Sequence, residues 1–177
     1  MIWDLDKLNL ERAATSPVST VQYARQLIEQ GDSASLAEAD AIYQSILADP
    51  ALPAGPDRAE IESTYGSLLC LLAQNTVESD TKLGLLEQAR TQLSSALLVR
   101  RRQTMPEAWA TSSANLALVY ITRYAQTENR LDVMSAHMAL DGTGEVFTAA
   151  ADQSSAEWVR SLREYLGVLV DRRQAPR

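Results

Sequence analysis

His137 is the only histidine in the chain, so it is the first side chain to consider for acid–base chemistry. On a helix it would lie about one turn from Asp132 and Asp141, and a carboxylate at that range could orient an imidazole as a general base. No second imidazole or thiolate stands at ligand spacing, so neither a metal site nor a cofactor is expected. Without such partners, His137 is interpreted as a surface or boundary residue, and no catalytic residue is predicted.

The run 141–145, Asp-Gly-Thr-Gly-Glu, has the residue types of a phosphate-binding loop or of an aspartyl nucleophile. Both chemistries need the acid at a strand end or in a tight loop, with backbone N–H groups free to hold an anion. The flanking segments 134–140 and 146–151 have helical patterns instead. A break between two helical stretches is therefore the favoured interpretation.

Two further features could be reactive or could bind a partner. Cys70 has no adjacent His or Lys to lower its thiol pKa, so a packed and unreactive thiol is expected. As the only cysteine, it cannot form an intrachain disulfide. The run Arg100-Arg101-Arg102 could bind an acidic partner, but it falls at an expected helix end, where positive charge complements the helix dipole. The helix-end interpretation is favoured.

The net charge of −7 is unevenly distributed. Residues 1–99 hold fourteen acidic and six basic side chains, whereas residues 100–177 hold nine and ten. An acidic amino-terminal half is poorly suited to a phosphate backbone, so nucleic acid is not an expected partner. No run of eighteen apolar residues occurs, so no membrane insertion is expected. The acidic first residues are unlike a signal peptide, and a cytoplasmic location is the expectation.

Helical periodicity covers most of the sequence, and no segment predicts a strand. The expected fold class is all-α, with about seven helices in antiparallel hairpins over residues 18–30, 34–48, 57–74, 81–101, 106–124, 131–151 and 154–173. The expected organisation is an amino-terminal arm or short helix (1–17), a single helical domain (18–173) and a frayed tail (174–177).

The most regular feature is a large-small-x-x-large signature that recurs about every fifty residues. Its small residues are Gly66, Ala117 and Gly167, which stand 51 and 50 positions apart, and an earlier copy is centred on Ala24. The expected second helices repeat a pattern as well, with a small residue at 39, 89 and 142 and a larger one four positions later. Such spacing predicts a stack of similar helical units, each burying its apolar face against the next.

These motifs resemble those of tetratricopeptide-repeat (TPR) proteins. In that family the first helix of each unit carries a large-small pair and an aromatic residue, as Leu116, Ala117 and Tyr120 do here. The run 106–110, Pro-Glu-Ala-Trp-Ala, is similar to a longer-period bacterial variant of the repeat. The usual unit has about 34 residues, so longer helices or loops are expected here. The resemblance implies hairpins stacked as a short right-handed TPR-like α-solenoid over residues 18–173.

The resemblance also implies a concave groove, lined by the first helix of each pair, that binds a protein segment. The residues at groove-facing positions are Arg25, Glu29, Glu60, Ser63, Ser67, Cys70, Thr111, Ala114, Leu118, Thr122, Glu164 and Arg172. They form a weakly polar surface without the Lys/Arg/Asn cluster that would hold a terminal carboxylate. An extended or helical segment with apolar anchors is the expected ligand.

The expected function is non-enzymatic protein–protein interaction, as an adaptor, scaffold or co-chaperone. The alternative is a self-associating structural module whose exposed repeat ends contact another copy, because the expected last helix keeps apolar residues such as Trp158, Leu162 and Leu166. A helical pocket for a small ligand, near His137, is a third hypothesis.

Overall fold

The structure is a computed structural model that describes residues 17–174, and every regular element in this range is a helix. The all-α prediction is confirmed for these residues. The expected amino-terminal arm and tail lie almost wholly outside them. The helices are α2 (Pro17–Gln30), α3 (Ser33–Ala48), α4 (Pro56–Asn75), α5 (Ser79–Val99), α6 (Pro106–Thr127), α7 (Arg130–Leu140), α8 (Thr143–Ala149) and α9 (Gln153–Gln174).

Local sequence signals explain where most of these helices begin. Pro56 and Pro106 occupy the first turn of α4 and α6, where the missing proline N–H is not needed. The side chain of Asp32 accepts hydrogen bonds from two backbone N–H groups at the start of α3, and Glu78 does the same for α5. Asn129 caps α7 through one such bond. These caps satisfy backbone donors that have no partner within the helix.

The chain divides into two compact units between Leu52 and Pro53. The first contains the α2/α3 hairpin, with a small core of Ala24, Leu27, Leu36, Ala39 and Tyr43. The second contains α4 to α9. The single domain expected over residues 18–173 stays a prediction.

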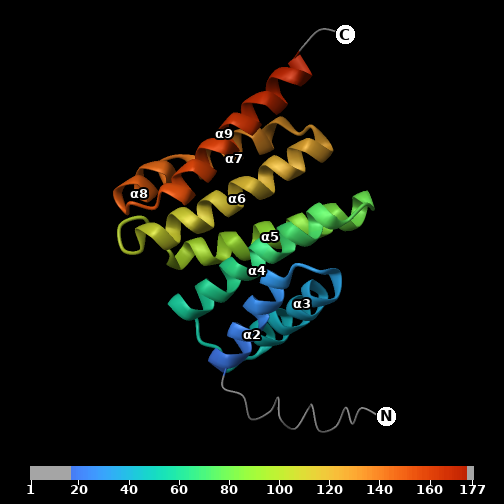
Figure 1. Cartoon of the computed structure of the whole chain (residues 1–177), viewed down its shortest axis with the longest axis vertical. Coiled ribbons are helices and arrows are strands. Elements are labelled where there is room, and N and C mark those ends of the chain that lie inside the picture. Colours follow the sequence, from blue (N-terminus) through green and yellow to red (C-terminus); the bar gives the residue numbers. More distant parts are fainter. Residues whose placement is uncertain (1–16, 175–177) are drawn as a thin grey trace. The chain divides into compact units, whose positions relative to one another are not determined.

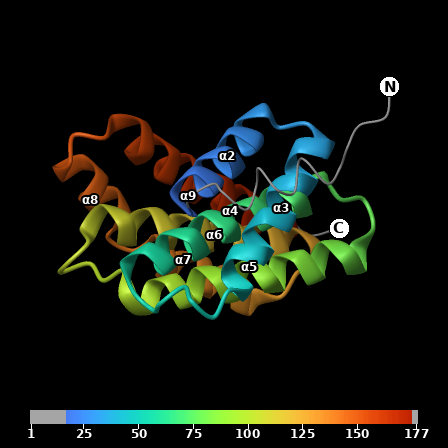
Figure 2. The ribbon, with the colours of Figure 1, turned by 90° about the horizontal axis from the view of Figure 1, so that it is seen from below.

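Helix α6 is the central helix of the second unit and contacts α4, α5, α7, α8 and α9 (Figures 1 and 2). Its buried positions include Ala110, Ala114, Ala117 and Ile121, and the small alanines allow the neighbouring helix axes to approach closely. The core around α6 is completed from α7, α8 and α9 by Ala136, Leu140, Phe147, Val159, Leu162 and Leu166.

The repeated small residues are packed in the hairpins but not in the last helix. A Cβ atom added to Gly66 would lie 2.6 Å from Leu93 Cγ and 3.2 Å from the Ala89 carbonyl oxygen, so α4 and α5 are in close contact there. Ala117 is fully buried in the core around α6. A Cβ atom on Gly167, by contrast, would meet nothing within 4 Å. No helix follows α9 in the described chain, so Gly167 has no second helix to approach.

The helix expected over residues 131–151 is two helices, α7 and α8, and the favoured break at Gly142 is confirmed. Gly142 has a left-handed backbone conformation with φ 72°. The Leu140 carbonyl oxygen at the end of α7 accepts hydrogen bonds from Thr143 Oγ1 and from Arg163 Nη2, each at 2.7 Å. These bonds fix the turn between α7 and α8 against α9.

Replacing Gly142 with Ala is expected to lower the free energy of unfolding by about 1–2 kcal/mol, because a Cβ atom disfavours the left-handed conformation. The added atom would also collide with the Arg102 guanidinium and would move that side chain. Gly144, inside α8, is the matched control: its added Cβ meets only Val159 Cγ1 at 3.7 Å. Gly144→Ala should stabilise by about 0.5–1 kcal/mol. Denaturant unfolding of both variants tests this, and equal effects would contradict it.

Candidate protein-binding site

Helices α4 and α6 carry eight of the predicted groove residues, and three of these are buried. Ser63, Cys70 and Ala114 are at most 3% exposed. Ser63 and Cys70 are covered because α4 packs directly on α6, where Ser63 Oγ lies 2.8 Å from Ser112 Oγ. Ala114 lies instead in the core that α6 forms with α7, α8 and α9. These three side chains therefore support contacts between helices and cannot touch a partner at the surface.

The other five groove residues of α4 and α6 remain partly or fully exposed. Glu60 and Ser67 are seven positions apart on α4, and Thr111, Leu118 and Thr122 follow at spacings of seven and four on α6. Residues at such spacings share one face of a helix. The α4/α6 face is the name used below for Glu60, Thr64, Ser67, Thr111, Leu118 and Thr122.

The hydroxyl groups of the α4/α6 face are already engaged in hydrogen bonds within their own helices. Thr64 and Thr111 each donate to the carbonyl oxygen four residues earlier at 3.0 Å. Ser67 and Thr122 do the same at 3.0 and 2.8 Å. Consequently the face offers methyl groups, the half-buried side chain of Leu118 and few hydrogen-bond donors. Such a surface can pack against apolar groups but is poorly equipped to orient a polar small molecule.

The remaining predicted groove residues lie elsewhere. Arg25 is half-buried and Glu29 is exposed, both on α2 in the first unit. Glu164 is exposed on α9, while the side chain of Arg172 falls outside those that the structure describes. The structure thus brings together the α4 and α6 residues of the predicted groove.

Cys70 is a buried thiol beneath the α4/α6 face. Burial raises its pKa to about 11, and a hydrogen bond with Thr122 offsets only part of this effect. Removal from water disfavours the thiolate, which is the nucleophilic form. The packed thiol expected from the sequence agrees with this environment.

Cys70 is expected to react at least about a hundredfold more slowly in the folded protein than in the unfolded chain at mildly alkaline pH, because both exposure and thiolate fraction are reduced. A chromogenic disulfide reagent, applied with and without denaturant, measures both rates. Comparable rates would show that the thiol is accessible and ionised in the folded state.

The acid–base pair considered around His137 is not assembled on α7. His137 is exposed, whereas Asp132 is buried and lies 3.5 Å from Arg123 of α6, measured between Oδ1 and Nη2. Between residues 17 and 174, no three His, Cys, Asp or Glu side chains are grouped as metal ligands. None of the described helices is long and apolar enough to span a bilayer.

The arginine run follows the end of α5, as expected. Arg100 is buried and donates from Nη1 to Ser112 Oγ at 3.1 Å and to the Ala108 carbonyl at 3.5 Å. This arginine therefore ties the end of α5 to the first turns of α6. Arg102 forms an ion pair with Glu145 of α8 at 2.9 Å, and its guanidinium carbon lies 5.4 Å from the ring centre of Trp109.

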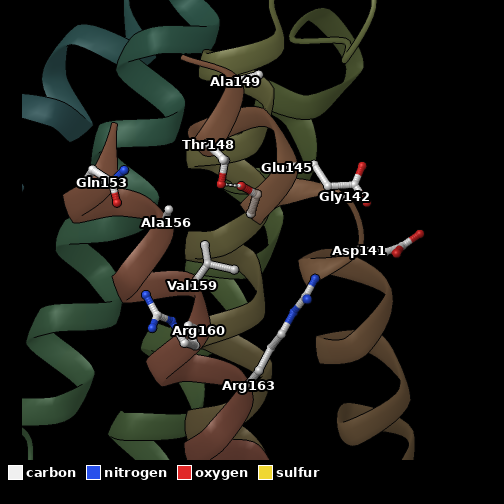
Figure 3. Close-up of a pocket in the computed structure, with 11 residues that line it drawn as sticks. Asp141, Gly142, Glu145, Thr148, Ala149, Gln153, Ala156, Val159, Arg160 and Arg163 are labelled. Atoms are coloured by element: carbon white, nitrogen blue, oxygen red, sulfur yellow. Dashed lines mark hydrogen bonds between the residues drawn. The ribbon is translucent and has the colours of Figure 1, made fainter. Parts of the chain in front are cut away.

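A cleft of about 720 Å³ lies between α8, α9 and the turn that precedes α8 (Figure 3). Arg160 and Arg163 extend from α9 into this region, and Val159 lies between Thr148 and Arg160. Two of the polar groups are engaged within the fold: Arg163 donates to the Leu140 carbonyl, and Thr148 Oγ1 donates to the Gly144 carbonyl at 2.8 Å. The cleft contains no nucleophile beside a base, so its chemistry is that of a surface contact.

One surface feature was missed by the sequence analysis. Leu131, Met134 and Met138 of α7 are 66%, 62% and 77% exposed, and these three residues are called the α7 row. The opposite side of α7 is buried and includes Ala136 and Leu140. The available signal in the sequence was that this helix has apolar residues on two opposite sides, only one of which is buried here. A helix that is apolar on all sides is normally buried.

The family resemblance rests on the motifs given above. Comparison of the chain with family models, with curated proteins and with solved structures finds no match. Membership of the TPR family thus stays a prediction, and function is inferred from the α4/α6 face and the α7 row.

Proposed function

We propose that this chain is a non-enzymatic protein-interaction module, an adaptor, scaffold or co-chaperone, that binds a protein segment on the α4/α6 face. The observation that carries this proposal is the set of intrahelical hydrogen bonds made by Thr64, Ser67, Thr111 and Thr122. Because these hydroxyls already have acceptors, an apolar segment can cover them without leaving a donor unsatisfied. A TPR-like stacking of the α4/α5 and α6/α7 hairpins is part of the proposal.

The charges beside this face indicate the kind of segment that would bind. Glu60 near the start of α4 and Glu107 in the first turn of α6 are exposed carboxylates. Because Ser63 contacts Ser112, these two helix starts lie at the same end of the face. A segment with apolar anchors and a basic residue near one end would therefore be complementary.

The test is affinity capture from a lysate of the source cells with wild type and with Leu118→Glu. Leu118 is half-buried at the surface, so a glutamate can reach water there, whereas the fully buried Ala114 would be an unsuitable site. Leu98→Glu on α5 is the control, since Leu98 is 74% exposed and lies off the α4/α6 face. A partner bound by wild type and by Leu98→Glu, but not by folded Leu118→Glu, supports the proposal. A partner retained by all three proteins contradicts it.

Self-association is the second candidate function, and the α7 row is the observation that favours it. The exposed side of the last helix is mixed, since it carries the charged residues Glu157, Arg160, Glu164 and Asp171 but also Tyr165 and Val168, which are 51% and 43% exposed.

A further inference from the structure

We propose that the α7 row is a self-association surface, through which the α7 helices of two copies pair antiparallel. Leu131, Met134 and Met138 lie within an arc of about 60° on a helix of 3.6 residues per turn. They form a narrow apolar strip in the middle of the exposed side of α7, with exposures of 62–77%. This inference deepens the second candidate function, and it does not depend on binding at the α4/α6 face because the two surfaces are separate.

Two charged residues beside the row are placed unfavourably for the helix that carries them. Arg130 is the first residue of α7 and Asp141 is its carboxyl-terminal cap, and both are exposed. Neither forms an ion pair with another described side chain. The helix dipole favours negative charge at the amino end and positive charge at the carboxyl end, the reverse of this arrangement. Both charges are thus unfavourable for α7 itself, although Asp141 also directly precedes Gly142, the amino-terminal cap of α8, where negative charge is favourable.

Antiparallel pairing of two α7 helices would satisfy both charges. Arg130 and Asp141 lie on the same edge of the row, because eleven residues correspond to about three helical turns. In a two-fold antiparallel pair, Arg130 of each copy faces Asp141 of the other, so two equivalent ion pairs form. A parallel pair would instead place arginine beside arginine and aspartate beside aspartate.

The same register brings the apolar side chains together. With Arg130 opposite Asp141, the two-fold axis passes between positions 135 and 136. Met134 and Met138 of one copy then alternate along the contact with those of the other, and the Leu131 side chains lie at its two ends. Methionine is flexible and fills irregular gaps, which suits a contact formed by two identical rows. Only a few side chains per copy take part, well below a standard interface of about 1,600 Å², so the dimer is weak.

Sedimentation equilibrium over a wide concentration range tests the pairing with the full chain. Wild type should dimerise reversibly, and Arg130→Asp or Asp141→Arg should each raise the dissociation constant at least about tenfold, since like charges then face each other twice. Circular dichroism should show both variants folded, because both positions are exposed. Leu118→Glu, on the α4/α6 face, should dimerise like wild type.

Charge exchange provides the decisive measurement. The double variant Arg130→Asp, Asp141→Arg should recover the dimer, because each copy again presents opposite charges at the two ends of the row. An equimolar mixture of the two single variants should form a heterodimer, although neither associates alone. A wild type that stays monomeric, or a dimer that none of these substitutions changes, would overturn the proposal. Failure of both rescues would overturn it as well.

Discussion

Replacing Leu93 with Ala is expected to lower the free energy of unfolding by about 2–5 kcal/mol and to remove most of the cost of a second substitution at Gly66. Leu93 is fully buried, and its Cγ atom is 2.6 Å from where a Gly66 Cβ would lie. In wild type, Gly66→Ala should therefore destabilise by about 1–3 kcal/mol through overpacking. Once Leu93 is Ala, its Cγ and Cδ2 atoms are gone and the Ala89 carbonyl oxygen at 3.2 Å remains the close contact, so Gly66→Ala should lose most of its cost.

A double-mutant cycle measured by denaturant unfolding determines this coupling. Gly84→Ala on α5 is the matched control, because a Cβ atom there would meet nothing within 4 Å. It should stabilise by about 0.5–1 kcal/mol whether residue 93 is Leu or Ala. If Gly66→Ala has the same effect in both backgrounds, α4 and α5 are not in contact at the repeated small residue.

Replacing Arg123 with Met is expected to destabilise the protein by about 1–3 kcal/mol near neutral pH. Arg123 bridges two helices, with Nη1 3.3 Å from Glu87 Oε2 on α5 and Nη2 3.5 Å from Asp132 Oδ1 on α7. Asp132 is buried, and burial raises its pKa while the charge of Arg123 opposes that rise. Without Arg123 the ionised carboxylate is buried without its counter-charge. The loss of stability is smaller than for a fully buried ion pair because Arg123 is partly exposed.

The destabilisation caused by Arg123→Met should shrink on acidification from about pH 7 to about pH 5. A carboxyl group whose folded pKa exceeds its unfolded value binds a proton more strongly when folded, so lowering the pH through that range favours the folded state. Removing Arg123 raises the folded pKa of Asp132 further, so the variant gains more from acidification than wild type does. Arg90→Met is the control, because Arg90 pairs with Glu87 near the surface and should show little pH-dependent change. If Arg123→Met lowers the free energy of unfolding equally at both pH values, this account is contradicted.

The helices could be predicted from the sequence because their ends are determined locally. Pro56 and Pro106 start helices through their fixed backbone geometry, and Gly142 breaks a helix through its left-handed conformation. The recurring small residues likewise predicted the close contact between helices at Gly66. Boundaries differ by only a few residues from those expected.

The surfaces were harder to predict, since exposure depends on which helices meet. Ser63, Cys70 and Ala114 occupy positions that the TPR resemblance places in a groove, but here other helices cover them. The contact between α4 and α6 covers Ser63 and Cys70, and the core with α7, α8 and α9 covers Ala114. The sequence analysis did not single out Met134 and Met138. They are exposed because α7 turns only Asp132, Ala136 and Leu140 fully inward.

The engaged hydroxyls of the α4/α6 face have a thermodynamic consequence for any segment that binds there. Few donors would exchange water for protein on binding, so the heat of association should come mainly from apolar surface. Calorimetry should then show a negative heat-capacity change, and affinity should depend only weakly on salt apart from the contribution of Glu60 and Glu107. A surface of this kind distinguishes partners by the shape of their apolar side chains more than by their hydrogen-bonding groups.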